Sequence, residues 1–467
     1  MYLMALDNID YIVITILFAV TLIIGYLFRR KNQTTVLFIY SDNNKLYTPN
    51  QFLIGYGIIE LVLCGVIGSL YGVSGIYYII FAILVNYLLS LFIVRVIYPY
   101  SLLEYVGLIF GAKAQAGFAS FFIIVLLFLA ITTTVFTFKL FQPLFGWNFV
   151  NSVFGVTGLT LIYVLIGGRS AIKFNLILSS IIVLLGFLFV IIAGVINLKG
   201  FSGIFANLHD LAKAKDVAYD FYTGFNINSK MLYQIIITGL FLTMASFLIE
   251  SSHDRRYMGF LTLLKIIPIG LMVMSGIIAI STPIVKNNSG DMDVVTIQTQ
   301  LPDGQTGYVV KAIRHDGKAK PLEATPGIIP PFFNPTTNLI EPNAYNYMLA
   351  SVMTLKYYLP KYLSVILVLV ILAAFMFGFA QYLHGISKLV VFDVYAKLNW
   401  LSEYGEDGRM WLARMSIIAA SIISLFGGYF LVPYLDLVIV TYVAGATALI
   451  FCLFMLYIIN YGQIQKK

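Results

Sequence analysis

Long runs of apolar residues, separated by short polar segments, repeat along the whole chain. Each run spans about 18 residues or more, which matches the thickness of a bilayer core at the helical rise of 1.5 Å per residue. The runs predict membrane-spanning helices near 10–28, 50–72, 75–97, 118–140, 149–166, 172–196, 231–250, 262–285, 360–388, 410–431 and 434–458. We therefore expect an all-α polytopic membrane protein with about eleven spans.

The segment 286–345 departs from this pattern. Within it, "DVVTIQTQLPDGQTGYVVKAI" has two alternating runs around Pro302-Asp303-Gly304, which predicts a β-hairpin. The predicted topology places this insertion on the extracytoplasmic surface. We interpret it as a passive decoration, a binding lid or a contact surface for a protein partner, and the sequence leaves these alternatives open.

Composition excludes a soluble globular protein. Of 467 residues, 60% are hydrophobic and 11% are charged, and the mean hydropathy is +0.91. A soluble core has no room for that much apolar surface. The lipid bilayer is therefore the expected environment.

The cationic residues indicate the orientation in the membrane. The first span has an acidic start, ends in Arg29-Arg30-Lys31 and lacks a small-residue cleavage site, so we interpret it as a retained anchor. Alternate loops carry Arg29, Arg30, Lys31 and Lys45, then Arg95 and Lys113, Arg169 and Lys173, Arg255 and Arg256, Lys397 and Arg409, and finally Lys466 and Lys467. This pattern predicts a multi-pass protein of the plasma membrane, a bacterial inner membrane by residue usage, with its N-terminus outside and C-terminus cytoplasmic. The net charge of +8 is mostly a topology signal and does not indicate nucleic-acid binding.

Catalytic and metal-binding signatures are absent from the sequence. No Walker loop, HExxH or G-x-S-x-G occurs, and the four histidines are scattered. Cys64 and Cys452 both lie in apolar spans, as buried small hydrophobes do. We expect no enzyme activity, cofactor, disulfide or metal centre, which leaves transporters, channels, receptors and subunits of larger complexes.

Five motifs resemble the sodium:solute symporters, the group of the bacterial sodium/galactose transporter. The resemblance covers about residues 10 to 400, in the family's order. The motifs are the anchor with its Arg-Arg-Lys segment, "IGSLYGVSGIYY", "SLLEYVGLIFGAKAQ", "YVLIGGRSAIKFNLILSSIIVLLG" and "YYLPKYLSVILVLVILAAFMFGFAQYLHGISKLVVFDVY".

The resemblance implies a LeuT-like core of five helices repeated in inverted orientation, preceded by one extra helix. It implies the extra helix at 10–28, the first repeat at 50–196 and the second repeat at 231–458, which contains the insertion. It also implies that the first and sixth core helices, at 50–72 and 231–250, are broken at the bilayer midplane.

Glycines of the first core helix have two interpretations. Gly65 and Gly68 weaken a continuous helix, and a broken backbone offers free amides and carbonyls to a substrate or coupling ion. The alternative is close packing of helices through small faces.

The family's second sodium site is altered in this sequence. By resemblance its ligands fall on the backbone carbonyls of Ile58, Leu61 and Ala374, on two hydroxyl positions that are Phe377 and Gly378 here, and near an aspartate position that is Leu176. Sodium needs hard oxygen donors, which a phenyl ring or a glycine side chain does not supply. We expect this site to be degenerate.

One carboxyl group is gained beside these losses. Glu60 falls where the galactose transporter has a substrate-binding asparagine. A charged carboxyl at that depth is costly, so the hypothesis is proton coupling or a cationic substrate. The alternative places Glu60 nearer an interface or in a structural hydrogen bond.

The eighth core helix carries a polar stripe. Phe377, Gln381, His384 and Lys388 follow spacings of four, three and four, so they share one helix face. We interpret Gln381 and His384 as lining a cytoplasmic exit. The alternative is a helix end that emerges into solvent and headgroups.

These features predict a secondary active transporter that moves a small solute by alternating access, with proton coupling or no coupling favoured over sodium. The alternative is a non-transporting sensor, or a membrane subunit whose partner protein binds at 286–345. The substrate is not readable, because the family moves many solute classes on one scaffold.

Overall fold

A computed structural model of the chain describes residues 8–29, 34–40, 57–97, 100–214, 222, 229–249, 263, 265–282, 292–300, 306–314, 328–329, 331–334, 339–359, 365–398 and 405–465. Most of these residues are helical. The α-helices are α1 (Asn8–Phe28), α2 (Thr35–Tyr40), α4 (Ile58–Tyr71), α5 (Ser74–Ile97), α6 (Leu102–Phe110), α7 (Ala112–Phe145), α8 (Gly155–Asn197), α9 (Gly200–Ala214), α10 (Ser229–Ile249), α12 (Ile266–Ser281), α13 (Ala350–Tyr358), α14 (Val365–Lys388), α15 (Glu406–Leu431) and α16 (Leu437–Gln465). Two short π-helical segments are η2 (Val150–Phe154) and η5 (Leu389–Tyr395), and η3 (Tyr347–Leu349) is a 3-10 helix.

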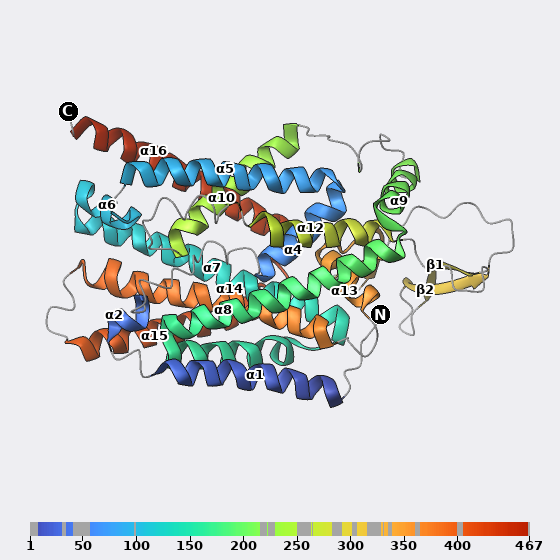
Figure 1. The fold of residues 1–467 in the computed structure, drawn as a ribbon, viewed down its shortest axis with the longest axis horizontal. Helices are drawn as coiled ribbons and strands as arrows, with labels where there is room; N and C mark the ends of the chain where they lie inside the picture. The colour runs from blue at the N-terminus through green and yellow to red at the C-terminus, as the bar shows by residue number, and fades with distance from the viewer. Residues whose placement is uncertain are drawn as a thin grey trace.

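The long helices form an elongated bundle (Figure 1). Seven helical segments of the described chain are long and apolar enough to cross a membrane, and α4, α10 and α12 are shorter apolar helices. Every predicted span overlaps one of these helices, with 149–166 and 172–196 both falling on Val150–Asn197. The start of α1 lies at the end of the bundle from which β1 and β2 project, and α16 ends at the opposite end (Figure 1).

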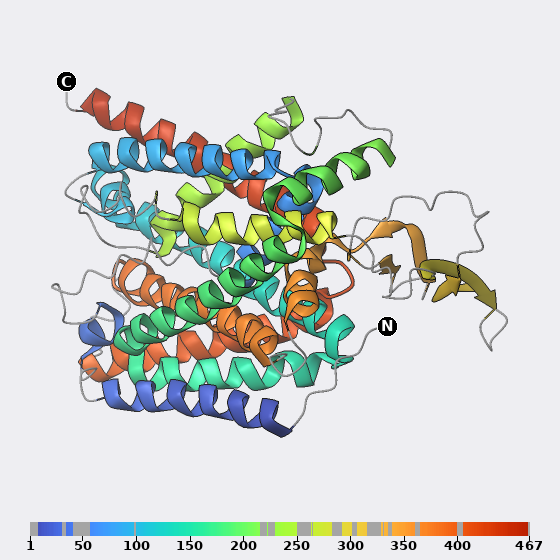
Figure 2. The same cartoon turned by 45° about the vertical axis from the view of Figure 1, so that its right-hand side comes forward.

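A break at Gly168 divides α8 into two limbs, 155–167 and 169–197. Its backbone has φ 52° and ψ −150°, which is not helical and which side chains other than glycine rarely adopt. A Cβ here would also lie 2.7 Å from Cδ2 of Phe38. The first limb packs beside α1, whereas the second runs diagonally away from it (Figure 2).

Helix α14 is the centre of the bundle. Nearly all of its residues are buried, and it packs against α7, α8 and α15. By contrast, α1, α15 and α16 expose many large apolar side chains, such as Ile16, Phe426 and Tyr442. An outer surface of this kind suits contact with lipid tails.

Helices of the two predicted repeats pack reciprocally. Helix α4 packs against α12, and α5 packs against α10. If the repeats start at α4 and α10, each pair joins the first helix of one repeat to the second helix of the other. A twofold relation between the repeats produces this arrangement.

The predicted breaks in the first and sixth core helices do not fall inside α4 or α10, and residues 50–56 of the first predicted helix lie outside the described residues. Helix α4 is continuous from Ile58 to Tyr71, and the non-helical residue is Gly57, with φ −80° and ψ 171°. Gly65 and Gly68 therefore do not unwind it, because its backbone hydrogen bonds and tight packing hold them in the helix. Helix α10 is one helix throughout, so no break falls within 231–249.

The described part of the insertion contains two antiparallel strand pairs. Strand β1 (Met292–Gln300) pairs with β2 (Thr306–Arg314), and Gln300 lies opposite Thr306. Strand β3 (Pro331–Asn334) pairs with β4 (Leu339–Tyr345). The first pair flanks the predicted turn at Pro302-Asp303-Gly304, which itself lies outside the described residues.

Candidate substrate and ion site

Glu60 lies in the first turn of α4, directly after the non-helical Gly57. Its side chain folds back toward that end, so that a Cβ on Gly57 would lie 2.5 Å from Oε2 of Glu60. This Oε2 atom is buried and accepts no hydrogen bond from any residue that the structure describes. A buried carboxylate oxygen without a donor costs free energy, which makes Glu60 a candidate binding group.

The helix that carries Glu60 packs between other core helices. Helix α4 contacts both α12 and α14. Glu60 therefore starts a helix that lies against two further helices of the bundle.

One carbonyl of α4 near the predicted sodium position accepts a hydrogen bond from a serine, which itself accepts one from a second serine. The Oγ of Ser351 in α13 donates to the Leu61 carbonyl oxygen at 3.3 Å. The Oγ of Ser275 in α12 donates to Ser351 at 2.8 Å. Since Leu61 also lies inside a continuous α-helix, its carbonyl is already engaged and is not an open ligand.

Gly65 and Gly68 lie where α4 touches its neighbours. A Cβ on Gly65 would lie 2.3 Å from Oγ of Ser351, and a Cβ on Gly68 would lie 2.1 Å from the Val273 carbonyl oxygen. This arrangement supports close packing through a small-residue face. A role for these glycines in substrate binding stays a prediction.

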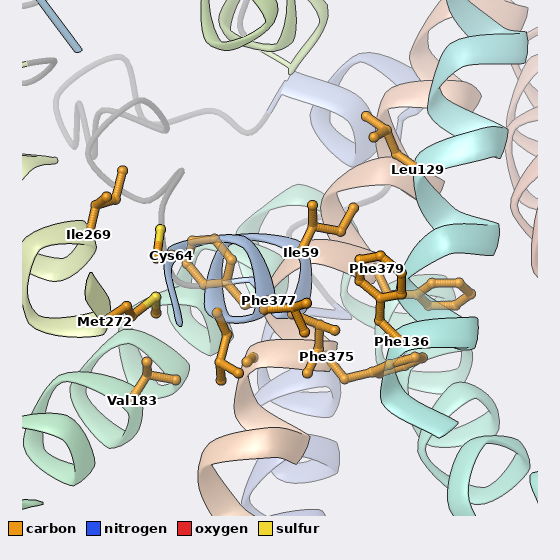
Figure 3. Close-up of a cluster of buried hydrophobic side chains, with 14 of the residues drawn as sticks. Ile59, Cys64, Leu129, Phe136, Val183, Ile269, Met272, Phe375, Phe377 and Phe379 are labelled. Carbon is orange, nitrogen blue, oxygen red and sulfur yellow. The ribbon is translucent and has the colours of Figure 1, made fainter. Parts of the chain in front are cut away.

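The remaining predicted sodium positions are apolar and buried. Ile58, Leu176, Ala374 and Phe377 are each at most 2% exposed. Phe377 belongs to a cluster of buried hydrophobic side chains that includes Ile59, Cys64, Val183, Ile269 and Met272 (Figure 3). No side chain of this set offers a hard oxygen donor.

Gly378 differs from its neighbours in having space beside it. The nearest atom that a Cβ would meet is Cε2 of Tyr382 at 3.5 Å, an ordinary van der Waals contact. A small side chain therefore fits at this position without moving the backbone.

Gln381 and His384 are both buried in α14, each 2% exposed. The Gln381 amide donates to the Phe377 carbonyl at 3.2 Å, while its Oε1 has no hydrogen-bond partner among the described residues. The alternative of a helix end emerging into solvent is wrong at these positions, because neighbouring helices cover this part of α14. Neither side chain lines an open exit in this conformation.

His384 packs against the short helix α2. Its Nε2 lies 3.4 Å from the Phe38 carbonyl oxygen, and the two rings are 6.4 Å apart. The charges of Arg169, Lys173 and Lys388 act on it.

Helix α2 closes this end of the bundle over His384. Phe38 is fully buried, and the Arg414 guanidinium of α15 lies 5.9 Å from its ring centre. The Thr35 backbone N–H donates to the Glu406 carboxylate. Tyr40, at the end of α2, has its pKa raised by burial and by the nearby Asp393 charge.

One buried residue and one short helix of the structure were not predicted from the sequence. Lys265 is fully buried. The sequence could have indicated this residue, because it is the one charged residue in the apolar run 262–285. Helix α2 has no comparable signal, because six residues after a basic segment are too few for a periodic pattern.

Comparisons with known proteins agree with this architecture. A model of the sodium:solute symporter family matches residues 60–304. A solved Na+-coupled sialic acid symporter, in a substrate-bound outward-open state, has a similar structure with a TM-score of 0.63 and 16% identity, covering 92% of this chain and 83% of that chain. No curated protein matches. The predicted polytopic helical fold of the LeuT-like type is confirmed, whereas the exact number of spans stays a prediction.

Proposed function

The chain belongs to the sodium:solute symporter family, and from this premise we propose that it moves a small solute across a membrane by alternating access, without a conventional second sodium site. The family assignment supports solute transport and a multi-pass membrane location, not enzyme activity. A bacterial inner membrane, with the N-terminus outside and the C-terminus in the cytoplasm, is the proposed location.

The observation that carries the proposal is the apolar character of the second sodium position. Phe377 and Gly378 stand at the two hydroxyl positions, and Leu176 stands at the aspartate position. The Phe377 ring packs in a hydrophobic cluster, and the Leu61 carbonyl accepts from Ser351. Transfer of sodium from water into this environment lacks the oxygen donors that would replace its hydration shell.

Glu60 is the proposed coupling group. It is the carboxyl at the start of α4, and its buried Oε2 has no hydrogen-bond partner within the described residues. Binding a proton, or a cationic solute, would supply the donor or the charge that this oxygen lacks. We therefore favour a proton, or no ion, over sodium as the coupling partner.

Uptake into proteoliposomes with imposed gradients tests this proposal. A panel of radiolabelled sugars, amino acids, carboxylates and vitamins would be offered with a sodium gradient, a proton gradient or neither. We expect uptake of one solute class that follows the proton gradient, or facilitated exchange without either gradient. Sodium-driven uptake would overturn the degenerate-site proposal, and proton-driven uptake unchanged in Glu60→Gln would remove Glu60 as the coupling group.

The same experiment separates the transporter from the alternative function. If no solute of the panel moves or binds, and a second polypeptide is recovered with the full-length protein, the chain acts as a sensor or membrane subunit. Deletion of the strand-bearing insertion 286–345 should then abolish recovery of that partner while leaving the helical bundle folded.

A further inference from the structure

Helix α2 is the shortest α-helix among the described residues, with six residues between α1 and α4 in the sequence. It lies at the end of the bundle opposite β1 and β2 (Figure 1), and it contacts α8, α14 and α15. Isolated helices of fewer than about 12 residues are marginal in water. The position of α2 is therefore set by its contacts with these three helices.

Phe38 makes the central contacts of α2. Its ring and carbonyl face the turn at Gly168 of α8, where a Cβ would lie 2.7 Å from Cδ2 and 2.8 Å from the carbonyl oxygen of Phe38. The same carbonyl oxygen lies 3.4 Å from Nε2 of His384 in α14. The Arg414 guanidinium of α15 lies 5.9 Å from the ring centre. Phe38 thus contacts all three helices that α2 covers.

Surface contacts hold the two ends of α2. At the first turn, the Glu406 carboxylate of α15 accepts a hydrogen bond from the Thr35 N–H. At the last residue, the Tyr40 ring lies 5.2 Å from the Phe392 ring of η5, and the Lys388 ammonium lies 5.8 Å from the Tyr40 ring centre. Both Glu406 and Tyr40 are exposed, so water competes for these contacts. The ends of α2 therefore release at lower cost than the helices of the core.

Polar groups of α14 lie beneath α2. His384 is buried against Phe38, and Gln381 lies three residues earlier on the same helix face. The Gln381 Oε1 atom is buried without a hydrogen-bond partner among the described residues. An unpaired amide oxygen costs free energy while it is covered, and it gains a partner when water reaches it. This face of α14 is therefore suited to a conformation in which α2 is displaced.

We propose that α2 is a movable gate at this end of the bundle, with Phe38 as its plug. When α2 separates from α8, α14 and α15, the face of α14 with Gln381 and His384 is open to water, and when α2 docks, Phe38 closes that face. The inference rests on the proposed function, because alternating access requires each end of the protein to open and close in turn. It assigns the closing element at one end to a segment outside the long helices.

Cysteine labelling of α14 tests the gate without any solute. The reporter is His384→Cys in the full-length protein, with Cys64→Ala and Cys452→Ala in the background to remove the native thiols. A small charged methanethiosulfonate, added to the protein in detergent, modifies the new cysteine only when water reaches it. The measured quantity is the rate of this modification.

Variants of the gate should accelerate labelling of His384→Cys, while changes at their neighbours should not. Phe38→Ala removes the plug, and Glu406→Ala removes the charged acceptor at the first turn of α2. Each should raise the rate about tenfold or more. Val36→Ala and Asp407→Ala change exposed side chains beside these two positions, and both should label at the rate of native α2.

A further comparison separates local opening from unfolding of the whole protein. Gly276→Ala disturbs the packing of α4 on α12 and leaves the contacts of α2 intact. Local opening of α2 gives an unchanged labelling rate in this variant. A rate that rises in step with the loss of stability would show that labelling follows global unfolding, which would overturn the proposal.

Equal labelling rates with Phe38→Ala and with native α2 would also overturn it. If His384→Cys cannot be purified, Gln381→Cys reports on the same face. Amide hydrogen exchange measures the opening without any cysteine, because residues 35–40 should exchange faster than 374–384. Exchange as slow as in α14 would contradict a movable α2. An intact labelling and exchange pattern without uptake of any solute in proteoliposomes would count against the proposed transport alone.

Discussion

The α carbon of Gly276 in α12 lies against the backbone of Gly65 in α4, so closely that a Cβ on Gly276 would be 2.2 Å from the Gly65 carbonyl oxygen. The same contact surface continues through Gly68, whose Cβ would meet the Val273 carbonyl. Backbone atoms on both sides cannot rotate away as side chains do. These glycines therefore set how α4 and α12 approach each other, and through them where Glu60 lies.

Gly276→Ala should destabilise the protein, because its methyl group can be accommodated only by moving one helix. We expect a loss of about 1 to 3 kcal/mol in the free energy of unfolding, measured by thermal or denaturant unfolding in detergent. Gly270→Ala on the same helix is the matched control, since a Cβ there meets nothing within 4 Å. Equal stability of both variants would contradict this packing.

Phe377 should contribute to stability as a core residue and not as part of an ion site. Phe377→Ala leaves a cavity in the buried cluster and is expected to cost about 3 to 5 kcal/mol. The wild-type Tm should not change when sodium chloride is replaced by choline chloride. A sodium-dependent rise in Tm that disappears on mutation of this region would show that a sodium site exists there.

Gly168 should tolerate no other residue. Its φ of 52° and the 2.7 Å approach of a Cβ to the Phe38 ring oppose even alanine. We expect Gly168→Ala to cost about 1 to 3 kcal/mol, as read from the Tm and from the yield of monodisperse protein. Gly158→Ala, in the first limb of α8 and with open space around a Cβ, should behave as wild type or slightly better.

Helix α2 should loosen when its contact with α15 is removed. The Glu406 carboxylate accepts from the Thr35 N–H, and Thr35 Oγ1 donates to the Glu406 carbonyl at 3.4 Å. Glu406→Ala removes a charged acceptor, so amide hydrogen exchange in 35–40 should become about tenfold faster or more. Asp407→Ala, which changes the neighbouring exposed carboxylate, should leave this exchange unchanged. Equal exchange in both variants would mean that the Glu406 contact does not hold α2.

Much of the architecture could be predicted from the sequence because lipid imposes a simple rule. In a bilayer every backbone polar group must be satisfied within the chain, so long apolar runs become helices wherever they occur. The apolar runs near 10–28, 75–97 and 410–431 accordingly appear as helices at nearly the predicted bounds. The alternation around Pro302-Asp303-Gly304 likewise predicted a strand pair, since the period of two is unambiguous in a polar segment.

The candidate site was predicted only in part. Glu60 was predicted because it is a carboxyl in an apolar run. Lys265 is likewise a charged residue in an apolar run, more than 200 residues further along the chain, but it was not predicted. Gly65 and Gly68 had two interpretations, unwinding or packing, which local sequence does not separate. Their neighbours Ser351 and Val273 decided between them.

The sequence by itself determined which segments enter the membrane, because that depends on the local balance of apolar and charged residues. Leu176, Phe377 and Gly378 carry no hydroxyl or carboxyl group, and that they stand at the family's sodium-site positions stays a prediction from the resemblance. Only the tertiary structure decided that α4 packs closely on α12, that α2 covers His384, and that the chain reverses at Gly168 against Phe38. These relations depend on contacts between distant segments, and packing of complete helices, not local propensity, selects those contacts.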